Sequence, residues 1–340
     1  MMKVLVTGGL GYIGSHTVVE LQQKGFDVII IDNLSNSSIE VLKGITAITN
    51  IEPEFFNLDL RDKHLVKDFF KQHQDISGVI HFAASKAVGE SVEQPLLYYE
   101  NNISTLGYVL QEILKLNTQN FIFSSSCTVY GQADQLPITE DAPIKPAESP
   151  YGNTKQIGEE ILRDVCKVQS KFKSVALRYF NPIGAHPSAK IGELPIGVPQ
   201  NLVPFITQTA IGKRKELSVF GDDYPTADGT CIRDYIHVVD LAKAHVVALE
   251  RLIENKGNTN FEVFNLGTGK GSSVLEAINA FESATGEKLN YKIAPRRPGD
   301  VIAAYADTHK ANSILGWKTQ LTLGDAMFSA WEWEKRCTEL

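Results

Sequence analysis

Short apolar runs alternate with longer segments of helical pattern through the first half of the chain, from Lys3 to about Arg178. The runs are continuous, which is typical of parallel strands that are buried on both faces. They lie at Val4–Thr7, Val28–Asp32, Val79–Ala83, Phe121–Ser125 and Ser174–Arg178, and the helical segments at Tyr12–Lys24, Leu65–His73, Leu96–Leu116 and Tyr151–Gln169. Strand alternating with helix predicts an α/β fold built on a doubly wound parallel sheet.

The pattern changes after about Asn181, where proline and glycine become dense and the predicted elements become shorter. Helices are expected at Asn201–Ile211, Val239–Glu254, Ser273–Thr285 and Leu323–Lys335, and short strands at Leu217–Phe220, Val263–Leu266 and Tyr291–Ala294. We therefore predict a Rossmann domain over residues 1–180 and a smaller C-terminal α/β domain over residues 181–340. The smaller domain should close over the carboxyl edge of the sheet, where ligands of such folds bind.

Three glycines, Gly8, Gly11 and Gly14, connect the first predicted strand to the first predicted helix. Glycines at this place let the backbone approach a pyrophosphate, whose charge lies against the helix N-terminus. The second strand ends in Asp32, which can accept hydrogen bonds from an adenosine ribose and would repel a 2′-phosphate. Together these residues predict a site for NAD rather than NADP. The alternative for Asp32 is a solvated carboxylate at a strand end.

Further polar residues stand at the ends of later strands. Asp59 can hydrogen-bond near the adenine amine or cap the helix that follows it, and the two interpretations stay open. His81 is more typical of a strand histidine with its hydrogen bonds made than of an acid–base group. Phe82 and Ala83 follow it and are expected to leave room for a cofactor.

The fifth strand leads into Ser126, and Tyr151 and Lys155 follow at the start of the next predicted helix. Helical residues four apart project from the same face. A free tyrosine has a pKa near 10, but a lysine cation and a nicotinamide cation would both favour the phenolate. We therefore expect Tyr151 to remove a proton from a substrate hydroxyl to which Ser126 is also hydrogen-bonded. The alternative is a surface tyrosine and lysine on an amphipathic helix.

Composition narrows the classes of partner. The chain has 340 residues, a formal net charge of -7 and no basic stripe, so a nucleic-acid partner is not expected. Its four cysteines are far apart, which suggests neither a disulfide framework nor a metal site. No apolar run approaches the roughly 20 residues that span a bilayer. We expect a cytoplasmic protein without a membrane partner.

These motifs, taken together, resemble the extended short-chain dehydrogenase/reductase superfamily. Within it the chain closely resembles the UDP-glucose (UDP-galactose) 4-epimerase family along nearly its whole length. The matching segments are Val4–Gly9, Lys86–Ser91, Phe121–Gly131, Arg178–Pro182 and Asp234–Val238.

The resemblance implies reversible epimerisation at C4 of a UDP-hexose through a transient 4-keto sugar. Tyr151 would take the proton of the O4 hydroxyl while tightly bound NAD accepts and then returns a hydride. The implied catalytic residues are Ser126, Tyr151 and Lys155. The implied cofactor contacts are Gly8, Gly11, Tyr12, Ile13, Gly14, Asp32, Asn33, Asn36, Ser37, Asp59, Leu60, Phe82, Ala83, Lys86, Asn101, Ser124, Tyr151, Lys155 and Phe180.

The resemblance also implies a set of substrate contacts. They are Ser126, Tyr151, Asn181, Asn201, Leu202, Val219, Phe220, Arg233, Arg297, Asp300 and Ala304. Arginine suits this site because its planar fork matches the oxygens of a diphosphate. For either arginine alone, a surface ion pair would be the more ordinary role, and only the family match favours the substrate site.

One position departs from the form of the family that is restricted to simple hexoses. That form carries a large aromatic residue a few positions after Arg-Arg-x-Gly-Asp, and counting places Ala304 there, with Tyr305 next. Alanine would leave room for a 2-N-acetyl group, so activity on UDP-N-acetylglucosamine and UDP-N-acetylgalactosamine is expected too. A register one residue later would assign the position to Tyr305 and reverse this expectation.

Two other functions compete with epimerisation. A nucleotide-sugar 4,6-dehydratase shares the fold and the tyrosine–lysine pair, but carries Thr-Asp-Glu where this chain has Ser126-Cys127-Thr128. A non-catalytic NAD-binding module would have little need for the serine, tyrosine and lysine together. The resemblance also implies a homodimer, through Leu96–Leu116 and Tyr151–Gln169, although their apolar stripes could equally be core.

Overall fold

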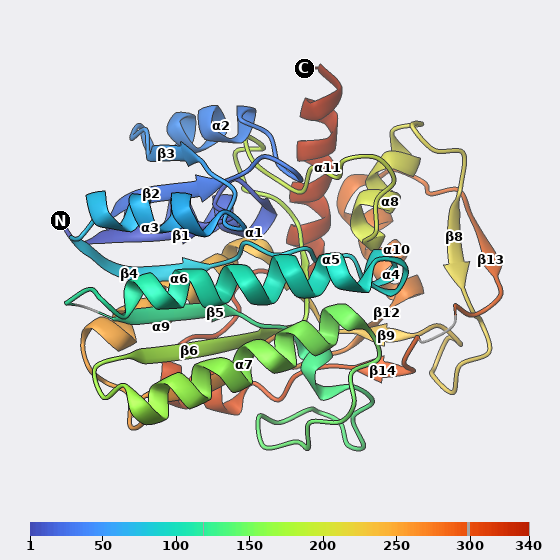
Figure 1. Ribbon diagram of the computed structural model, residues 1–340. Coiled ribbons are helices and arrows are strands. Elements are labelled where there is room, and N and C mark those ends of the chain that lie inside the picture. Colours follow the sequence, from blue (N-terminus) through green and yellow to red (C-terminus); the bar gives the residue numbers. More distant parts are fainter. Residues whose placement is uncertain (118, 298–299, 340) are drawn as a thin grey trace.

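Seven parallel strands form the central sheet of the computed structural model, which describes residues 1–117, 119–297 and 300–339. The strands are β1 (Lys3–Thr7), β2 (Asp27–Asp32), β3 (Glu54–Asn57), β4 (Ile76–His81), β5 (Asn120–Ser124), β6 (Lys173–Tyr179) and β11 (Phe261–Leu266). Their order is β11-β6-β5-β4-β1-β2-β3 (Figure 1). The α/β prediction of a doubly wound parallel sheet is therefore confirmed.

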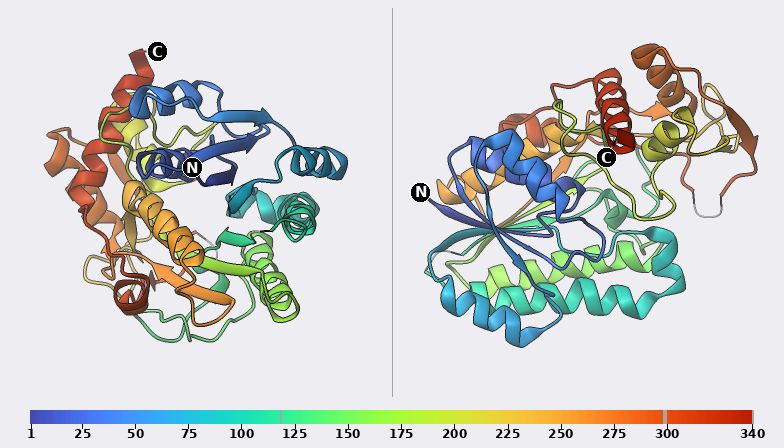
Figure 2. Two further views of the ribbon diagram at one scale, coloured as in Figure 1. Left: turned by 90° about the vertical axis from the view of Figure 1, so that its left-hand side faces the viewer. Right: turned by 90° about the horizontal axis from the view of Figure 1, so that it is seen from above.

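Helices cover both faces of this sheet (Figure 2). One face carries α1 (Tyr12–Gln23), α2 (Glu40–Thr49) and α9 (Val238–Ile253), and the other carries α3 (Lys63–Gln72), α6 (Thr105–Ile113) and α7 (Pro150–Val168). Val4 and Val6 of β1 pack into the core on the first face, while Leu5 packs into the core on the second. Burial on both faces explains why the strand is apolar at every position.

Strand β1 lies between β2 and β4. The chain places β2 and β3 on one side of β1 and then places β4 and the later strands on the other side. In open parallel sheets, such a reversal opens a crevice beyond the carboxyl ends of the strands, and ligands bind there. The glycine loop follows β1, Asp32 ends β2, and Ser124 ends β5. The topology therefore brings the predicted cofactor and catalytic residues to one edge.

Two elements from the second half of the chain belong to the large sheet. The sequence patterns at Val239–Glu254 and Val263–Leu266 were expected in the smaller lobe. Instead, α9 packs against the sheet, and β11 pairs with β6 in parallel. This assignment was wrong because local pattern cannot say which sheet a short buried strand joins. The domain boundary at residue 180 stays a prediction. The chain returns to the large sheet after that residue, because α9 and β11 both belong to it.

The remaining elements form a smaller lobe at the carboxyl edge, on the right of Figure 1. Its strands are β7 (Asn181–Ile183), β8 (Leu217–Phe220), β9 (Ile232–Arg233), β10 (Tyr235–His237), β12 (Ser272–Ser273), β13 (Tyr291–Ala294) and β14 (Ala303–Ala304). Its helices are α8 (Leu202–Ala210), α10 (Val274–Thr285) and α11 (Leu323–Glu339). Ile206, Phe281 and Met327, one from each helix, meet in a core of their own.

The segment predicted as one helix, Leu96–Leu116, is divided by a π-helical turn. It comprises α5 (Pro95–Tyr99), η1 (Glu100–Ser104) and α6, after the short α4 (Val88–Glu93). The extra residue of a π turn redirects side chains. Within it Asn102 donates to the hydroxyl of Thr154 at 3.0 Å. The apolar stripe of α6 is core, because Leu106 and its neighbours pack under the sheet.

The short elements that remain are η2 (Cys127–Tyr130) and η3 (Ala311–Leu315). Along the described ranges, no helix has both the length and the apolar composition to cross a membrane. In the same part of the chain, no group of three or more His, Cys, Asp or Glu side chains is arranged to hold a metal ion.

Candidate active site

The glycine loop after β1 is closed so tightly that side chains would not fit. Gly8 has a φ of +69°, and a β-carbon on Gly14 would lie 2.2 Å from the carbonyl oxygen of Gly8. Gly11 is the N-cap of α1, where no side chain caps the helix and the first turn carries no acidic residue. The backbone N–H groups at this end are therefore available to an anion such as a pyrophosphate.

Asp32 is a fixed, buried carboxylate rather than a solvated one. It accepts hydrogen bonds from the backbone N–H of Leu10 at 3.1 Å, the N–H of Leu34 at 3.0 Å and the hydroxyl of Ser37 at 2.8 Å. These bonds place its oxygens beside the glycine loop. The solvated alternative for Asp32 was therefore wrong, while Asn36 lies exposed on the same loop.

Asp59 lies next to this corner. It forms an ion pair with Arg61 at 2.7 Å, and it accepts a hydrogen bond from Asn33 at 3.2 Å. Arg61, whose side chain donates to the carboxylate, lowers the pKa of Asp59 to about 2. Asp62, not Asp59, caps α3. The capping interpretation of Asp59 was therefore wrong.

The residues after β4 approach the glycine loop closely. The backbone nitrogen of Ala83 lies 2.8 Å from the point that a β-carbon on Gly8 would occupy. His81 bonds the hydroxyl of Thr7 at 2.8 Å, and burial lowers its pKa to about 3, so it is neutral. It is the buried, neutral strand histidine that was expected rather than an acid–base group, but its hydrogen bonds are not all made, because Nε2 has no partner among the described residues. Phe82 packs against His245 with ring centroids 4.7 Å apart.

Some predicted cofactor contacts lie beyond the carboxyl ends of the strands, and others lie in the core. Asn101 donates to Ser85 at 2.9 Å, and the Lys86 ammonium lies 6.0 Å from the ring centroid of Tyr12. Leu60 is a buried side chain of the core under the sheet, and Ile13 packs partly against the opposite core. A contact from the buried Leu60 would therefore come from its backbone.

Ser126, Tyr151 and Lys155 form a buried cluster. Helix α7 begins with Pro150 after the cap Ser149, whose hydroxyl accepts from the N–H of Gly152. Tyr151 and Lys155 are thus one turn apart in the first two turns, with the Lys155 Nζ atom 5.8 Å from the Tyr151 ring centroid. Both side chains are buried rather than on the surface, so the amphipathic-surface alternative was wrong.

Hydrogen bonds tie this cluster to the end of β5. The Nζ atom of Lys155 donates to the carbonyl oxygen of Ser124 at 2.7 Å. The hydroxyl of Ser124 shares a hydrogen bond of 2.7 Å with the hydroxyl of Tyr179. Ser126 interacts with the Tyr151 hydroxyl and also accepts from the N–H of Thr128 at 3.2 Å.

Burial shifts the protonation of this cluster. Burial, followed by the neighbouring Tyr179, raises the pKa of Tyr151 above its usual value, while the hydrogen bond with Ser126 opposes the rise. Burial lowers the pKa of Lys155 to about 8, although the carboxylate of Glu159 works against it. The chain's own residues therefore hold Tyr151 as a neutral phenol beside a lysine whose pKa is about 8.

Two arginines of the smaller lobe meet at one carboxylate. Asp300 lies 3.3 Å from the guanidinium of Arg233 and 3.0 Å from that of Arg297. Arg297 also lies over the ring of Phe220, at 5.0 Å from its centroid. Val219, beside Phe220 in β8, is fully buried and contributes to the core of the lobe.

Ala304 is a half-buried residue of β14. It lies opposite Arg233 in the pairing of β14 with β9, and it packs against the cluster that contains Phe180 and Tyr130. The ring of Tyr305 lies elsewhere, with Cδ1 3.1 Å from the point that a β-carbon on Gly271 would occupy.

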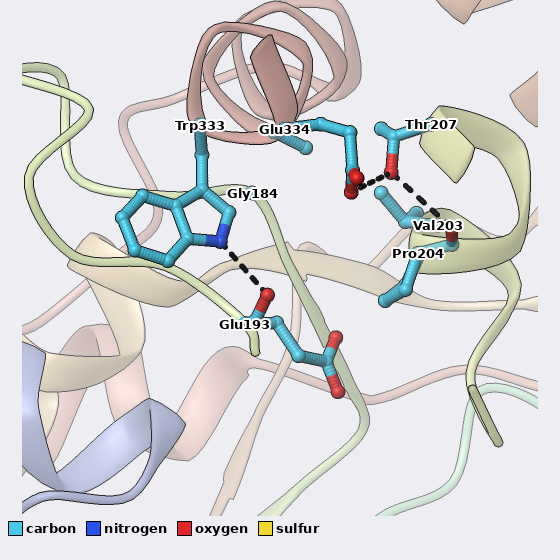
Figure 3. Close-up of a pocket in the computed structure, with 8 residues that line it drawn as sticks. Gly184, Glu193, Val203, Pro204, Thr207, Trp333 and Glu334 are labelled. Carbon is cyan, nitrogen blue, oxygen red and sulfur yellow. Dashed lines mark hydrogen bonds between the residues drawn. The ribbon is translucent and has the colours of Figure 1, made fainter. Parts of the chain in front are cut away.

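The sequence patterns missed Glu193, a carboxylate that joins the two lobes. Its Oε1 atom accepts from Asn201 at 2.6 Å and lies 3.5 Å from the Lys86 ammonium. Its backbone carbonyl accepts from the indole of Trp333 at 2.8 Å, and its carboxylate points away from that ring (Figure 3). No sequence signal marked it, because it lies in an irregular segment rich in glycine and proline.

A small pocket lies behind this segment, between α8 and α11, and Leu202 begins α8 beside it. Its lining residues are Gly184, Glu193, Val203, Pro204, Thr207, Ala330, Trp333 and Glu334 (Figure 3). Neither Ser126 nor Tyr151 is among them, so this pocket is distinct from the Ser126–Tyr151–Lys155 cluster. Asn181, in β7, is half-buried and donates its backbone N–H to the backbone carbonyl oxygen of Asp234 at 2.9 Å.

A parallel sheet with a glycine loop and a buried Ser126–Tyr151–Lys155 cluster defines an enzyme of the extended short-chain dehydrogenase/reductase class. Residues 5–328 match the protein family described as GDP-mannose 4,6 dehydratase. UDP-glucose 4-epimerase of Bacillus subtilis (strain 168) is 49% identical over 333 residues, which cover 98% of this chain and 97% of that protein.

Two solved structures are similar over nearly the whole chain. UDP-glucose-4-epimerase from Stenotrophomonas maltophila, with bound NAD and formylated UDP-arabinopyranose, has a TM-score of 0.96 and 47% identity, covering 100% of this chain and 99% of that one. UDP-glucose 4-epimerase from Bifidobacterium longum, with NAD+ and UDP, has a TM-score of 0.93 and 48% identity, covering 98% of each chain. The chain belongs to the UDP-glucose 4-epimerase family, a family of isomerases.

Proposed function

We propose that this chain interconverts UDP-glucose and UDP-galactose by inverting C4 of the hexose, using tightly bound NAD. The observation that carries the proposal is the buried cluster of Ser126, Tyr151 and Lys155, which lies at the same edge of the sheet as the glycine loop. Relatives and solved structures named UDP-glucose 4-epimerase, two of them with NAD, support it.

The residues around the glycine loop fit NAD. The uncapped start of α1 suits the pyrophosphate, and the oriented Asp32 carboxylate suits the adenosine ribose hydroxyls. Lys86 and Asn101 lie further along the same edge for the nicotinamide ribose. When bound there, NAD supplies a hydride acceptor and donor for C4 and a positive charge near Tyr151.

Tyr151 handles the proton in this proposal. A phenol acts as a base once it has lost its own proton. The Lys155 ammonium and an oxidised nicotinamide would both lower the pKa of Tyr151 and so favour its phenolate form. Tyr151 then accepts the proton of the sugar O4 hydroxyl and returns it after the transient 4-keto sugar has presented its other face. Ser126 hydrogen-bonds the same oxygen and stabilises its partial negative charge.

Arg233 and Arg297 hold the UDP diphosphate in this proposal. A dianion attracts both guanidinium groups, and bidentate hydrogen bonds to phosphate oxygens would compete with the contacts that they make to Asp300. Asp300 would then be free to accept a hydrogen bond from a ribose hydroxyl. Asn181, Asn201, Leu202, Val219 and Phe220 complete the substrate contacts.

We extend the proposal to UDP-N-acetylglucosamine and UDP-N-acetylgalactosamine. The small side chain of Ala304 packs against the cluster that contains the predicted cofactor contact Phe180, while the Tyr305 ring lies beside Gly271. This arrangement supports Ala304, rather than Tyr305, as the residue that limits substituent size.

The dehydratase alternative lacks its catalytic acid. The segment that begins at Ser126 continues with Cys127 and Thr128 in η2, where a dehydratase carries carboxylates. The nearby carboxylate of Asp234 is already engaged, since it accepts from the N–H groups of Thr268 and Ala306. A non-catalytic NAD-binding module would not need a buried, charged lysine beside a tyrosine.

The proposed enzyme is a cytoplasmic homodimer. Its contact would use α4, α5 and α7, where Val92, Leu96 and Val168 expose 62%, 80% and 77% of their surface. Sedimentation at micromolar concentration tests the assembly, and a monomer would contradict it.

The function is tested on purified protein with no added cofactor. UDP-galactose should be converted to UDP-glucose, and denaturation should release NAD or NADH in about equal molar amount to the chain. Conversion only when NAD is added would contradict tight binding. Release of NAD without any conversion would favour the non-catalytic module, and formation of a 4-keto-6-deoxy sugar would favour the dehydratase.

A further inference from the structure

A buried ion pair lies directly behind the catalytic cluster. Arg178 of β6 donates to both carboxylate oxygens of Glu159 in α7, at 2.9 Å and 2.6 Å. The two side chains are 4% and 3% exposed, so the pair is closed off from water. Glu159 is one turn beyond Lys155 on the same helix, and neither member of the pair was singled out by the sequence patterns.

The pair is connected to the serines that end β5. The hydroxyl of Ser125 donates to Glu159 at 2.6 Å. Ser125 is fully buried, and its two chain neighbours are the catalytic contacts. Ser124 supplies the carbonyl oxygen that accepts from Lys155, and Ser126 supplies the hydroxyl next to Tyr151.

Arg178 contacts the same segment on the far side of Ser126. The Arg178 guanidinium lies over the ring of Tyr130, at 4.8 Å from the centroid. Tyr130 is the last residue of η2, the short helix that Ser126 caps. Glu159 and Arg178 thus contact the stretch 124–130 on both sides of Ser126.

Stability alone does not account for such a pair. Removing two charges from water is costly, and well-packed apolar residues often replace a buried ion pair at no loss of stability. A buried pair does impose a single geometry on the groups that it contacts, because its hydrogen bonds are directional and strong in a low dielectric.

We propose that Glu159 and Arg178 are positioning residues for catalysis, which hold Ser125 so that Ser124 and Ser126 face Lys155 and Tyr151. This inference rests on the proposed function. The carboxylate has a second effect, since its negative charge favours the ammonium form of Lys155.

Charged and titratable groups surround Lys155 and Tyr151, the two residues that the pair positions. The groups around Lys155 are Tyr151 and Glu159 on α7 and the neutral His81 on β4. The groups around Tyr151 are Tyr98 on α5, Cys127 on η2 and Tyr179 on β6. Glu159 is the carboxylate among them. Its removal should therefore make Lys155 lose its proton at a lower pH.

The chain provides a matched control for the test. Arg251 of α9 and Glu262 of β11 form a second buried bidentate pair on the same sheet, with N–O distances of 2.7 Å and 2.9 Å. The contacts of this pair do not include Ser124, Ser125 or Ser126. Apolar replacement of each pair, Glu159→Leu with Arg178→Met and Glu262→Leu with Arg251→Met, removes equal charge.

The experiment measures kcat and KM for UDP-galactose, the pH profile of kcat, and bound NAD in the wild type and both double variants. For Glu159→Leu/Arg178→Met we expect kcat at least tenfold lower, KM within about threefold, and the alkaline limb of the profile at lower pH. The control pair should keep the wild-type kcat and profile. Unchanged kcat and profile in the first variant, or equal losses in both, would overturn the inference.

Ser125→Ala keeps the ion pair and removes the hydrogen bond from Ser125 to Glu159. It therefore tests the inference even if a double variant does not fold. It should lower kcat at least threefold and leave the alkaline limb where it is in the wild type. A wild-type kcat in this variant overturns the positioning role. If the wild type itself does not epimerise UDP-galactose, the proposed function fails instead.

Discussion

The Nζ atom of Lys155 lies 5.8 Å from the ring centroid of Tyr151, one helical turn further along α7. The lysine side chain is held there by its 2.7 Å hydrogen bond to Ser124. Because both side chains are buried, the charge of the lysine acts on the phenol with little screening by water. The proton chemistry of the proposed reaction depends on this relationship.

Replacing Tyr151 with phenylalanine should remove the base and keep the shape of the site. We expect kcat for UDP-galactose to fall by about 10²–10⁴-fold, the usual contribution of a positioned acid–base group. The measurement is initial rate with saturating UDP-galactose, and the control is the NAD content of the same preparation, which should equal that of the wild type. Unchanged turnover would remove Tyr151 as the base.

Activity should fall as the pH rises through about 8. Burial, opposed by Glu159, sets the pKa of Lys155 to about 8. The lysine is a cation below that pH and neutral above it, so its support of the phenolate is lost on the alkaline side. A kcat/KM profile from pH 6 to pH 10 measures this. A profile that stays flat to pH 9.5 would contradict it, and Lys155→Met should be slow without the alkaline limb.

Much of the site could be predicted from the sequence because its motifs are local. The glycines, Asp32 and the Tyr151–Lys155 spacing each lie within one strand–turn–helix unit, where chain distance fixes spatial distance. Burial of Lys155 could not be predicted from its charged character, because it depends on the packing of α7 against β5.

The ion pairs of Glu159 and Glu193 and the placement of β11 could not be predicted, because they depend on contacts between distant segments. The partner of Glu159 is Arg178, and the partners of Glu193 are Lys86 and Asn201, which lie in other elements. Glu159 had one usable signal, its position four residues after Lys155. The placement of β11 in the large sheet likewise required tertiary structure, since neighbours in a sheet need not be neighbours in sequence.

Gly14→Ala should weaken NAD binding. The added β-carbon would lie 2.2 Å from the carbonyl oxygen of Gly8, so the loop must open. Such overpacking costs about 1–3 kcal/mol, or roughly tenfold to hundredfold in affinity. NAD released on denaturation of the purified variant measures the loss. Gly107→Ala, where a β-carbon meets nothing within 4 Å, should retain a full complement of NAD.

Ala304→Tyr should separate the two classes of sugar. A tyrosine side chain at this position, against the cluster that contains Phe180, would fill the space left for the acetyl group, so kcat/KM for UDP-N-acetylgalactosamine should fall roughly 100-fold or more. UDP-galactose, which lacks that group, should be turned over at a rate within about threefold of the wild type. Equal loss on both sugars would mean that the residue supports the site in general. Tyr305→Ala is the matched control: its ring lies beside Gly271, so it should change both rates alike. If this variant instead alters only the acetylated sugar, the size-selecting position is residue 305.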